Sequence, residues 1–412
     1  MNSANIVIIG GGAAGLMAAA QLGGTNARIV VMEKRERFGR KLLITGKGRC
    51  NITNMRPWNE FQQHIHPDAN FLKNAFYAFS NERLVEFFQQ AGLATKVERG
   101  ERLFPESDRS LDVLDALLDV IEQGGIELLP EHVVQTLVRR EADGKFELCV
   151  ETPQGEVFWE ADQVVVATGG LSYPMTGSTG DGHRWAESMQ HPMVPCFPAI
   201  TALKPHAYDE NLQGILLTNV RMDLWVGGNL VQQEEGEFSF TELGMEGGIA
   251  FRSSRRAVRA LLNHEKVQVV VDLKPNLTED QLFARIRREK VAQPKIQVRE
   301  LLRKMMPKQL VYPFWTAHPG LKEEQIPRAL KNWKFVIAEY GSYARAVVTA
   351  GGVSLKAVSR KTMESKQVPG LYFVGEVLDL DGDTGGYNLQ IAFSTAAAAA
   401  EALRKKISAG TC

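Results

Sequence analysis

The stretch Asn5–Leu22, NIVIIGGGAAGLMAAAQL, decides the fold. It opens with a continuous apolar run from Ile6 to Ile9, which is typical of a strand buried on both faces of a parallel sheet. Three glycines follow with the spacing G-x-G-x-x-G, and the alanines after them favour a helix. The stretch therefore predicts a strand, a tight turn and a helix, the beginning of a βαβ unit.

Each glycine of this turn has a physical use. Gly10 permits the tight turn, Gly12 lets a diphosphate approach the backbone, and Gly15 lets the helix pack closely on the strand. The alanines with Leu16 and Met17 favour a helix, whose N-terminus would offer N–H groups and the positive end of the helix dipole. The turn is thus suited to a dinucleotide.

The second strand, within ARIVVMEK, ends at Glu33 and is followed by Lys34. Glu33 stands about 20 residues after the glycines, where a carboxylate accepts a hydrogen bond from a ribose hydroxyl. An acid here also disfavours a 2′-phosphate. An ordinary βαβ unit with a glycine-rich turn is the alternative, but strand, helix and acid together favour the dinucleotide.

The C-terminal stretch Gly370–Lys406 favours FAD over NAD. A strand over Leu371–Val374 ends in Gly375 and Glu376, and a glycine-rich turn then leads into a helix from about Asn388. An acid after such a strand can bond the ribityl chain, and a helix N-terminus can stabilise charge on the N1–O2 edge of a flavin. A middle strand that ends in Ala167-Thr168-Gly169-Gly170 also suits close passage of a dinucleotide.

The loop GRKLLITGKGRCNITN, Gly39–Asn54, is rich in glycine and basic residues. It is not the P-loop of nucleoside triphosphate-binding proteins, because the motif G-x-x-x-x-G-K-[ST] is absent. We expect it to wrap the flavin, with Arg40 and Lys41 at the diphosphate and Thr45–Asn51 along the ribityl chain and ring. Cys50 has no cysteine nearby, so a small packed side chain is favoured over a catalytic thiol.

These motifs, together with VVVATGGLSYPMTGSTGDG, TAGGV and GEVLDLDGDTGGYNLQIAFST, resemble the BaiN-like, aminoacetone oxidase-like family of FAD-dependent oxidoreductases. The resemblance covers essentially the whole chain. It implies an α/β fold: a glutathione-reductase-type Rossmann FAD-binding domain interrupted by an inserted substrate domain, β-rich and partly helical. It also implies hydride transfer through the flavin to or from a small amine, ketone or enone.

The expected domains are 1–194 and 347–412 for FAD binding, and 195–346 for the insert, which would hold a β-barrel-like part and a helical part at about 278–332. Within the insert, Arg252–Lys308 holds 15 Lys and Arg against 6 Asp and Glu. Such an excess can mark a nucleic-acid surface or an anionic substrate. A solvated helical face is favoured, because few aromatic residues interleave.

Two residues are candidates for catalysis. Tyr387 would lie near the flavin. Glu242, in FTELGMEGGIAF, replaces the histidine that the family tends to have in the phrase F-T-H-x-G-x-S-G-P. By motif and resemblance, the expected cofactor-binding residues are Gly10, Gly12, Ala13, Ala14, Gly15, Glu33, Lys34, Arg40, Lys41, Thr45, Gly46, Gly48, Arg49, Cys50, Asn51, Val133, Ala167, Thr168, Gly169, Gly375, Glu376, Asp383, Gly386, Tyr387, Asn388 and Leu389.

Two other functions stay open: an RNA-directed flavoprotein that uses the basic segment, and a non-catalytic flavin-binding redox sensor. NAD(P)H is a possible transient reductant, although no second G-x-G-x-x-G occurs. The chain has 412 residues, 48 basic and 48 acidic, so net charge indicates no partner. The four cysteines form no C-x-x-C or zinc spacing. We find no signal-peptide pattern or apolar run of about 20 residues, and we expect a cytoplasmic protein without metal or membrane contact.

Overall fold

The computed structural model describes residues 2–410. The chain divides into two compact units, and the second is inserted in the first. Unit 1 consists of Met1–Phe197 and Val347–Cys412, and unit 2 of Pro198–Ala346. None of the helices within the described range combines the length and the apolar character that a bilayer span requires.

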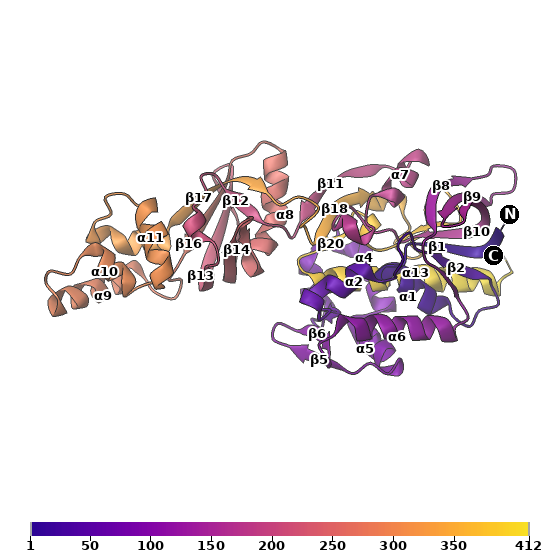
Figure 1. Cartoon of the computed structure of the whole chain (residues 1–412), viewed down its shortest axis with the longest axis horizontal. Helices are drawn as coiled ribbons and strands as arrows, with labels where there is room; N and C mark the ends of the chain where they lie inside the picture. The colour runs from indigo at the N-terminus through magenta and orange to yellow at the C-terminus, as the bar shows by residue number, and fades with distance from the viewer. Residues whose placement is uncertain (1, 411–412) are drawn as a thin grey trace. The chain divides into compact units, whose positions relative to one another are not determined.

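Unit 1 is built on one mixed sheet of order β7-β2-β1-β10-β9-β8, with β19 also paired to β10 (Figure 1). The central strand β1 runs parallel to both β2 and β10. Ile6–Ile9 of β1 are buried, as the apolar run predicted. The strands of this sheet are β1 (Asn2–Ile9), β2 (Ile29–Met32), β7 (Glu127–Leu129), β8 (Val133–Arg139), β9 (Phe146–Thr152), β10 (Gly155–Val166) and β19 (Leu371–Phe373).

Helices pack around this sheet and on one another. Helix α1 (Ala13–Leu22) contacts α6 (Ser110–Gln123) and α13 (Gly385–Ser408). Helix α13 also contacts α4 (Ala69–Ala78). The predicted helix start at about Asn388 is wrong, because α13 begins at Gly385. The Asn388 amide donates to the carbonyls of Gly382 and Thr384 from inside the first turn, so this residue closes the turn after the helix has begun.

Two glycines of the first turn are required by close backbone contacts. Gly10 has φ +109°, and a Cβ added there would lie 2.5 Å from the carbonyl oxygen of Ala167. A Cβ on Gly15 would lie 1.9 Å from the carbonyl oxygen of Gly10. The turn therefore holds β1, α1 and the end of β10 together only because both side chains are absent.

Shorter elements complete unit 1. They are α2 (Arg40–Ile44), β3 (Thr53–Asn54), α3 (Trp58–Phe61), β4 (Ile65–His66), α5 (Asn81–Gln90), β5 (Thr95–Glu98), β6 (Arg102–Pro105), α7 (Asp181–Ser188), β11 (Met193–Ala199), β18 (Val348–Val353) and β20 (Asp381–Gly382).

Unit 2 holds a closed barrel of order β12-β15-β14-β13-β16-β17, against which α8 (Gly248–Leu262) packs. Its interior contains a cluster of aromatic rings, among them Phe238, Phe240 and Trp333. The barrel strands are β12 (Leu203–Pro205), β13 (Leu216–Val226), β14 (Asn229–Thr241), β15 (Gly244–Glu246), β16 (Val267–Asp272) and β17 (Trp333–Tyr340).

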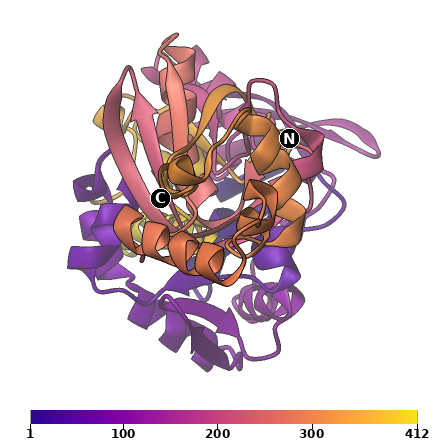
Figure 2. The same ribbon diagram turned by 90° about the vertical axis from the view of Figure 1, so that its left-hand side faces the viewer.

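A helical segment lies between β16 and β17, where its helices gather beside the barrel (Figure 1 and Figure 2). It consists of α9 (Glu279–Ala292), α10 (Val298–Arg303), α11 (Lys308–Ala317) and α12 (Ile326–Lys331). The sequence analysis did not predict α8, and it placed α11 only within the helical part at about 278–332 without a helix of its own. Pro313 lies inside α11, where it disguises the helical pattern because proline usually ends a helix.

Candidate functional site

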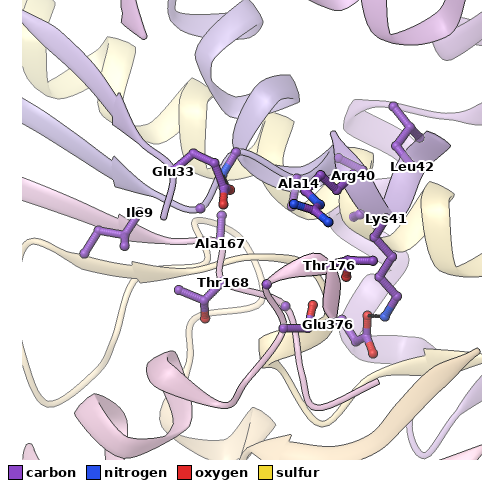
Figure 3. A pocket seen from close by; sticks show the side chains of 18 of the residues that line it. Ile9, Ala14, Glu33, Arg40, Lys41, Leu42, Ala167, Thr168, Thr176 and Glu376 are labelled. Atoms are coloured by element: carbon purple, nitrogen blue, oxygen red, sulfur yellow. Dashed lines mark hydrogen bonds and ion pairs between the residues drawn. The ribbon is translucent and has the colours of Figure 1, made fainter. Parts of the chain in front are cut away.

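A cavity that is partly open to solvent lies in unit 1 where the carboxyl ends of β1, β2 and β10 meet (Figure 3). In open α/β sheets, this edge is where ligands bind. The predicted cofactor residues that line it are Gly10, Gly12, Ala13, Ala14, Glu33, Lys34, Arg40, Lys41, Thr45, Ala167, Thr168, Gly169, Glu376, Asn388 and Leu389.

The glycine-rich turn supplies one wall of the cavity. Gly12 is the N-cap of α1 and has no side-chain cap, so the first N–H groups of the helix have no such partner. A Cβ on Gly12 would meet no atom within 4 Å. The space beside this backbone is therefore open to a ligand, and the helix N-terminus there favours an anion.

Glu33 holds the shape of this wall. One carboxylate oxygen accepts a hydrogen bond from the Gly11 N–H at 2.8 Å, and the other accepts one from the Arg35 N–H at 2.8 Å. Burial raises the pKa of Glu33, and the two N–H groups with Lys34 and Arg35 oppose that rise. A carboxylate has further lone pairs, so Glu33 can also accept a hydrogen bond from a ribose hydroxyl.

The basic residues of the wall differ in their partners. Lys41 forms an ion pair with Glu376 at 2.6 Å (Figure 3). Lys34 forms one with Asp181 at 2.5 Å. Arg40 is exposed and makes no hydrogen bond or ion pair with the residues that the structure describes. Arg40 is therefore a guanidinium of this wall that is available to an anionic ligand.

Thr168 lines the cavity, but its hydroxyl group points into the protein. Its hydroxyl oxygen is buried and has no hydrogen-bond partner among the described residues. A Cβ added to Gly182 would lie 2.4 Å from this oxygen, so the hydroxyl packs against the first turn of α7 rather than facing the ligand space.

The remaining predicted residues do not line the cavity. They are Gly15, Gly46, Gly48, Arg49, Cys50, Asn51, Val133, Gly375, Asp383, Gly386 and Tyr387. Gly15 lies behind the turn against Gly10. Around Val133, the lining residues are its two neighbours, His132 and Val134.

Within the basic loop, Arg49 points to other partners. It pairs with Glu98 and Asp108, and its guanidinium lies 4.2 Å from the centre of the Phe104 ring. Cys50 is fully buried, and this burial raises the pKa of its thiol to about 12. A thiol with that pKa is protonated at neutral pH, which agrees with a packed side chain rather than a nucleophile.

Tyr387, the first catalytic candidate, is buried in unit 1. Its ring stacks on His64 at 4.6 Å and meets the edge of Phe61 at 4.8 Å. His64 and His66 both bond the carboxylate of Asp383, each at 2.8 Å. This cluster supports the turn that precedes α13 from behind the cavity wall.

Glu242, the second candidate, is an exposed turn residue between β14 and β15 of unit 2. The neighbouring Thr241 hydroxyl donates to Glu246 at 2.6 Å, which fixes the turn without Glu242. Glu242 is not among the residues that line the cavity of unit 1.

The sequence analysis did not assign part of the lining, which comes from the stretch after β10: Thr176, Gly177, Ser178, Asp181 and Trp185. The spacing G-x-x-G-x-G in this stretch was a usable signal. Gly177 and Gly180 have positive φ, so the chain turns sharply between β10 and α7 and comes back to the cavity.

The chemistry of the lining residues therefore fits FAD. Helix N–H groups and Arg40 suit a diphosphate, and Glu33 suits a ribose. The second helix terminus at the cavity, with Gly385 and Asn388, is placed for a second anionic or polar part of the same ligand.

Comparison with known proteins agrees. Residues 4–402 match the HI0933-like protein Rossmann domain. The chain is 31% identical to the 3-dehydro-bile acid delta(4,6)-reductase of Clostridium scindens, over 95% of this chain and 96% of the relative. It is 30% identical to the ribosomal RNA dihydrouridine synthase of Haemophilus influenzae, over 97% of this chain and 98% of the relative. The Escherichia coli synthase of the same name is 28% identical, with 98% of each chain covered.

Among solved structures, the 3-ketosteroid delta1-dehydrogenase of Sterolibacterium denitrificans matches over 100% of both chains, with a TM-score of 0.51 and 12% identity. A quinol-fumarate reductase matches over 99% of this chain and 75% of its own, with a TM-score of 0.51 and 16% identity. At these identities the likeness shows the fold alone. The predicted α/β Rossmann fold is confirmed, and the chain belongs to the HI0933-like family of FAD-dependent oxidoreductases.

Proposed function

We propose that this enzyme reduces a carbon–carbon double bond that is conjugated to a carbonyl group. The observation that carries the proposal is the full-length similarity to two kinds of relative. By name, one reduces double bonds in a 3-oxo bile acid, and the other converts uridine to dihydrouridine. Both substrates contain an alkene conjugated to a carbonyl, so the reaction is what these relatives share, although their substrates differ greatly in size.

The reaction is a two-electron reduction. Reduced FAD, when bound, would supply the hydride for the carbon β to the carbonyl, and a proton would complete the product at the α carbon. The alkene would gain two hydrogens in total, and the flavin would be left oxidised. The residues of this chain would bind and orient the cofactor: Arg40 and the N-terminus of α1 would hold the diphosphate, and Glu33 would hold the ribose.

Two substrate classes fit this reaction. A small enone is the counterpart of the bile acid relative, and a uridine within RNA is the counterpart of the two synthases. The basic segment Arg252–Lys308 favours RNA, because it carries nine more positive than negative charges in a chain whose net charge is zero. Amines and simple ketones have no counterpart among these three relatives. NAD(P)H stays a prediction as the reductant.

The test starts from chemically reduced holoenzyme under anaerobic conditions, so that no natural reductant has to be known. Cyclohexenone or a uridine-containing RNA is added, and the visible absorption of oxidised flavin is followed. We expect its return together with a product heavier by two hydrogens. Cyclohexanone, which lacks the alkene, is the matched control. If neither alkene reoxidises the flavin, while an amine reduces the oxidised enzyme, the proposal is wrong.

A further inference from the structure

The helical segment of unit 2 contains a group of cations that its own carboxylates do not balance. Arg285 of α9 donates to the carbonyl oxygen of Lys304, the residue after α10, at 2.9 Å. The Lys304 ammonium pairs with Glu289 at 2.5 Å. The pKa of Glu289 is lowered chiefly by Lys304, and then by the positive charges of Arg285 and Arg288, so Arg288 also acts on this carboxylate. Three cations therefore share one acid.

Lys274, in the turn after β16, belongs to the same group. Burial lowers the pKa of its half-buried ammonium, and the positive charge of Arg285 lowers it further. The nearest acid in the sequence, Asp272, is already paired with Lys331 at 2.7 Å. We define the cationic cluster as Lys274, Arg285, Arg288 and Lys304. Repulsion within it would be relieved by a bound anion.

Two further arginines belong to α10, the helix that Lys304 follows. Arg299 and Arg303 are four residues apart and so share one face of that helix, and both are exposed. Arg303 and Arg288 make no ion pair with any residue in the described part of the chain. The guanidinium of Arg299 lies 6.0 Å from the centre of the Tyr312 ring, which is half exposed.

Aromatic rings beside arginines distinguish RNA from other polyanions, because bases stack on exposed rings while phosphates pair with the cations. Tyr312 is such a ring, because it is half exposed and lies beside Arg299. The sequence analysis found few aromatics in this segment, because Tyr312 comes from the next helix, α11. The tertiary structure brings it to the arginines.

We propose that the cationic cluster and the adjoining face of α10 bind the sugar–phosphate backbone of an RNA substrate. This inference rests on the proposed function and narrows it to the RNA class. It also gives the insert a role that is separable from the flavin cavity, since all the residues of this surface belong to unit 2 and all the lining residues belong to unit 1.

The experiment uses full-length holoenzyme and a labelled oligouridine, with binding read by fluorescence anisotropy at several salt concentrations. The test variant is the double substitution R288Q/R303Q. The matched control is R360Q/K361Q, which removes two exposed cations from unit 1. Each contact with a phosphate of single-stranded RNA adds about 0.7 to the slope of log K against log salt concentration. Two lost contacts therefore weaken binding about 25-fold at ~0.1 M salt.

We expect that loss in the test variant, a salt slope lower by about 1.4, and unchanged binding in the control. Equal binding of the RNA by both variants would overturn the proposal. Displacement of the RNA by polyglutamate at equal charge concentration would also overturn it, and would point to an acidic protein partner. Reoxidation by cyclohexenone is measured in parallel. It stays unchanged in the test variant, so failure of the RNA surface is distinguishable from failure of alkene reduction.

Discussion

Substitution of Gly12 by alanine isolates the binding role of the glycine-rich turn from its structural role. The backbone at Gly12 has φ −86° and ψ −171°, which alanine adopts without strain. The added Cβ meets no protein atom within 4 Å, but it projects from a residue that lines the cavity. The methyl group therefore takes space from a ligand rather than from the protein.

The two expected effects differ in size. For folding, alanine stabilises by about 0.4–1 kcal/mol through the unfolded chain, and a poorer N-cap offsets a similar amount, so G12A changes the stability of the protein without FAD by about 1 kcal/mol or less. For binding, a phosphate displaced from one N–H group loses about 1.5–3 kcal/mol. That loss raises the Kd for FAD about 10- to 150-fold.

The assay is reconstitution of flavin-free protein, with flavin fluorescence for the Kd and thermal unfolding for stability. G15A is the control, because its Cβ would lie 1.9 Å from the Gly10 carbonyl oxygen, and such overpacking costs about 1–3 kcal/mol or more before any ligand is added. Unchanged FAD affinity in G12A would refute the reasoning. So would a loss of stability in flavin-free G12A as large as that of G15A.

Further predictions concern the loop and the cluster behind the cavity. We expect R40Q to weaken FAD binding about tenfold or more while the unfolding temperature stays unchanged. R49Q breaks the ion pairs with Glu98 and Asp108 and should leave the affinity for FAD unchanged. Equal Kd values for FAD in the two reconstituted variants would contradict this contrast. Burial would raise the pKa of Asp383, but hydrogen bonds from His64 and His66 hold it below its ordinary value. The stabilisation by the ionised carboxylate is present above about pH 4 and is lost as pH falls through the lowered pKa. D383N should therefore lower the free energy of unfolding by about 1–3 kcal/mol at pH 7 and by less in acid. If the difference in unfolding free energy between wild type and D383N, measured with denaturant, does not shrink on acidification, the prediction is wrong. Because burial raises the pKa of Cys50 to about 12, iodoacetamide should label the half-buried Cys149 before Cys50 in native protein, as peptide mapping can show; prior labelling of Cys50 would contradict this burial.

The sequence by itself determined the features whose physics is local. A strand, a turn and a helix start follow from Ile6–Ile9 and the glycine spacing, because burial on both faces and a close backbone approach each require particular side chains at neighbouring positions. The same holds for Glu33, which ends the next strand and therefore reaches the same sheet edge. Ile9, Gly10, Gly12 and Glu33 all line the cavity.

Only the tertiary structure decided which residues of one loop face the cavity. Arg40 and Arg49 look equivalent in the sequence, yet the antiparallel pairing of β5 with β6 brings Glu98 to Arg49 while Arg40 stays on the wall. Lys41 finds its partner Glu376 at a separation of 335 residues. The direction of a side chain depends on such distant partners, because ion pairs and stacking form between segments that adjoin only after the sheet has assembled.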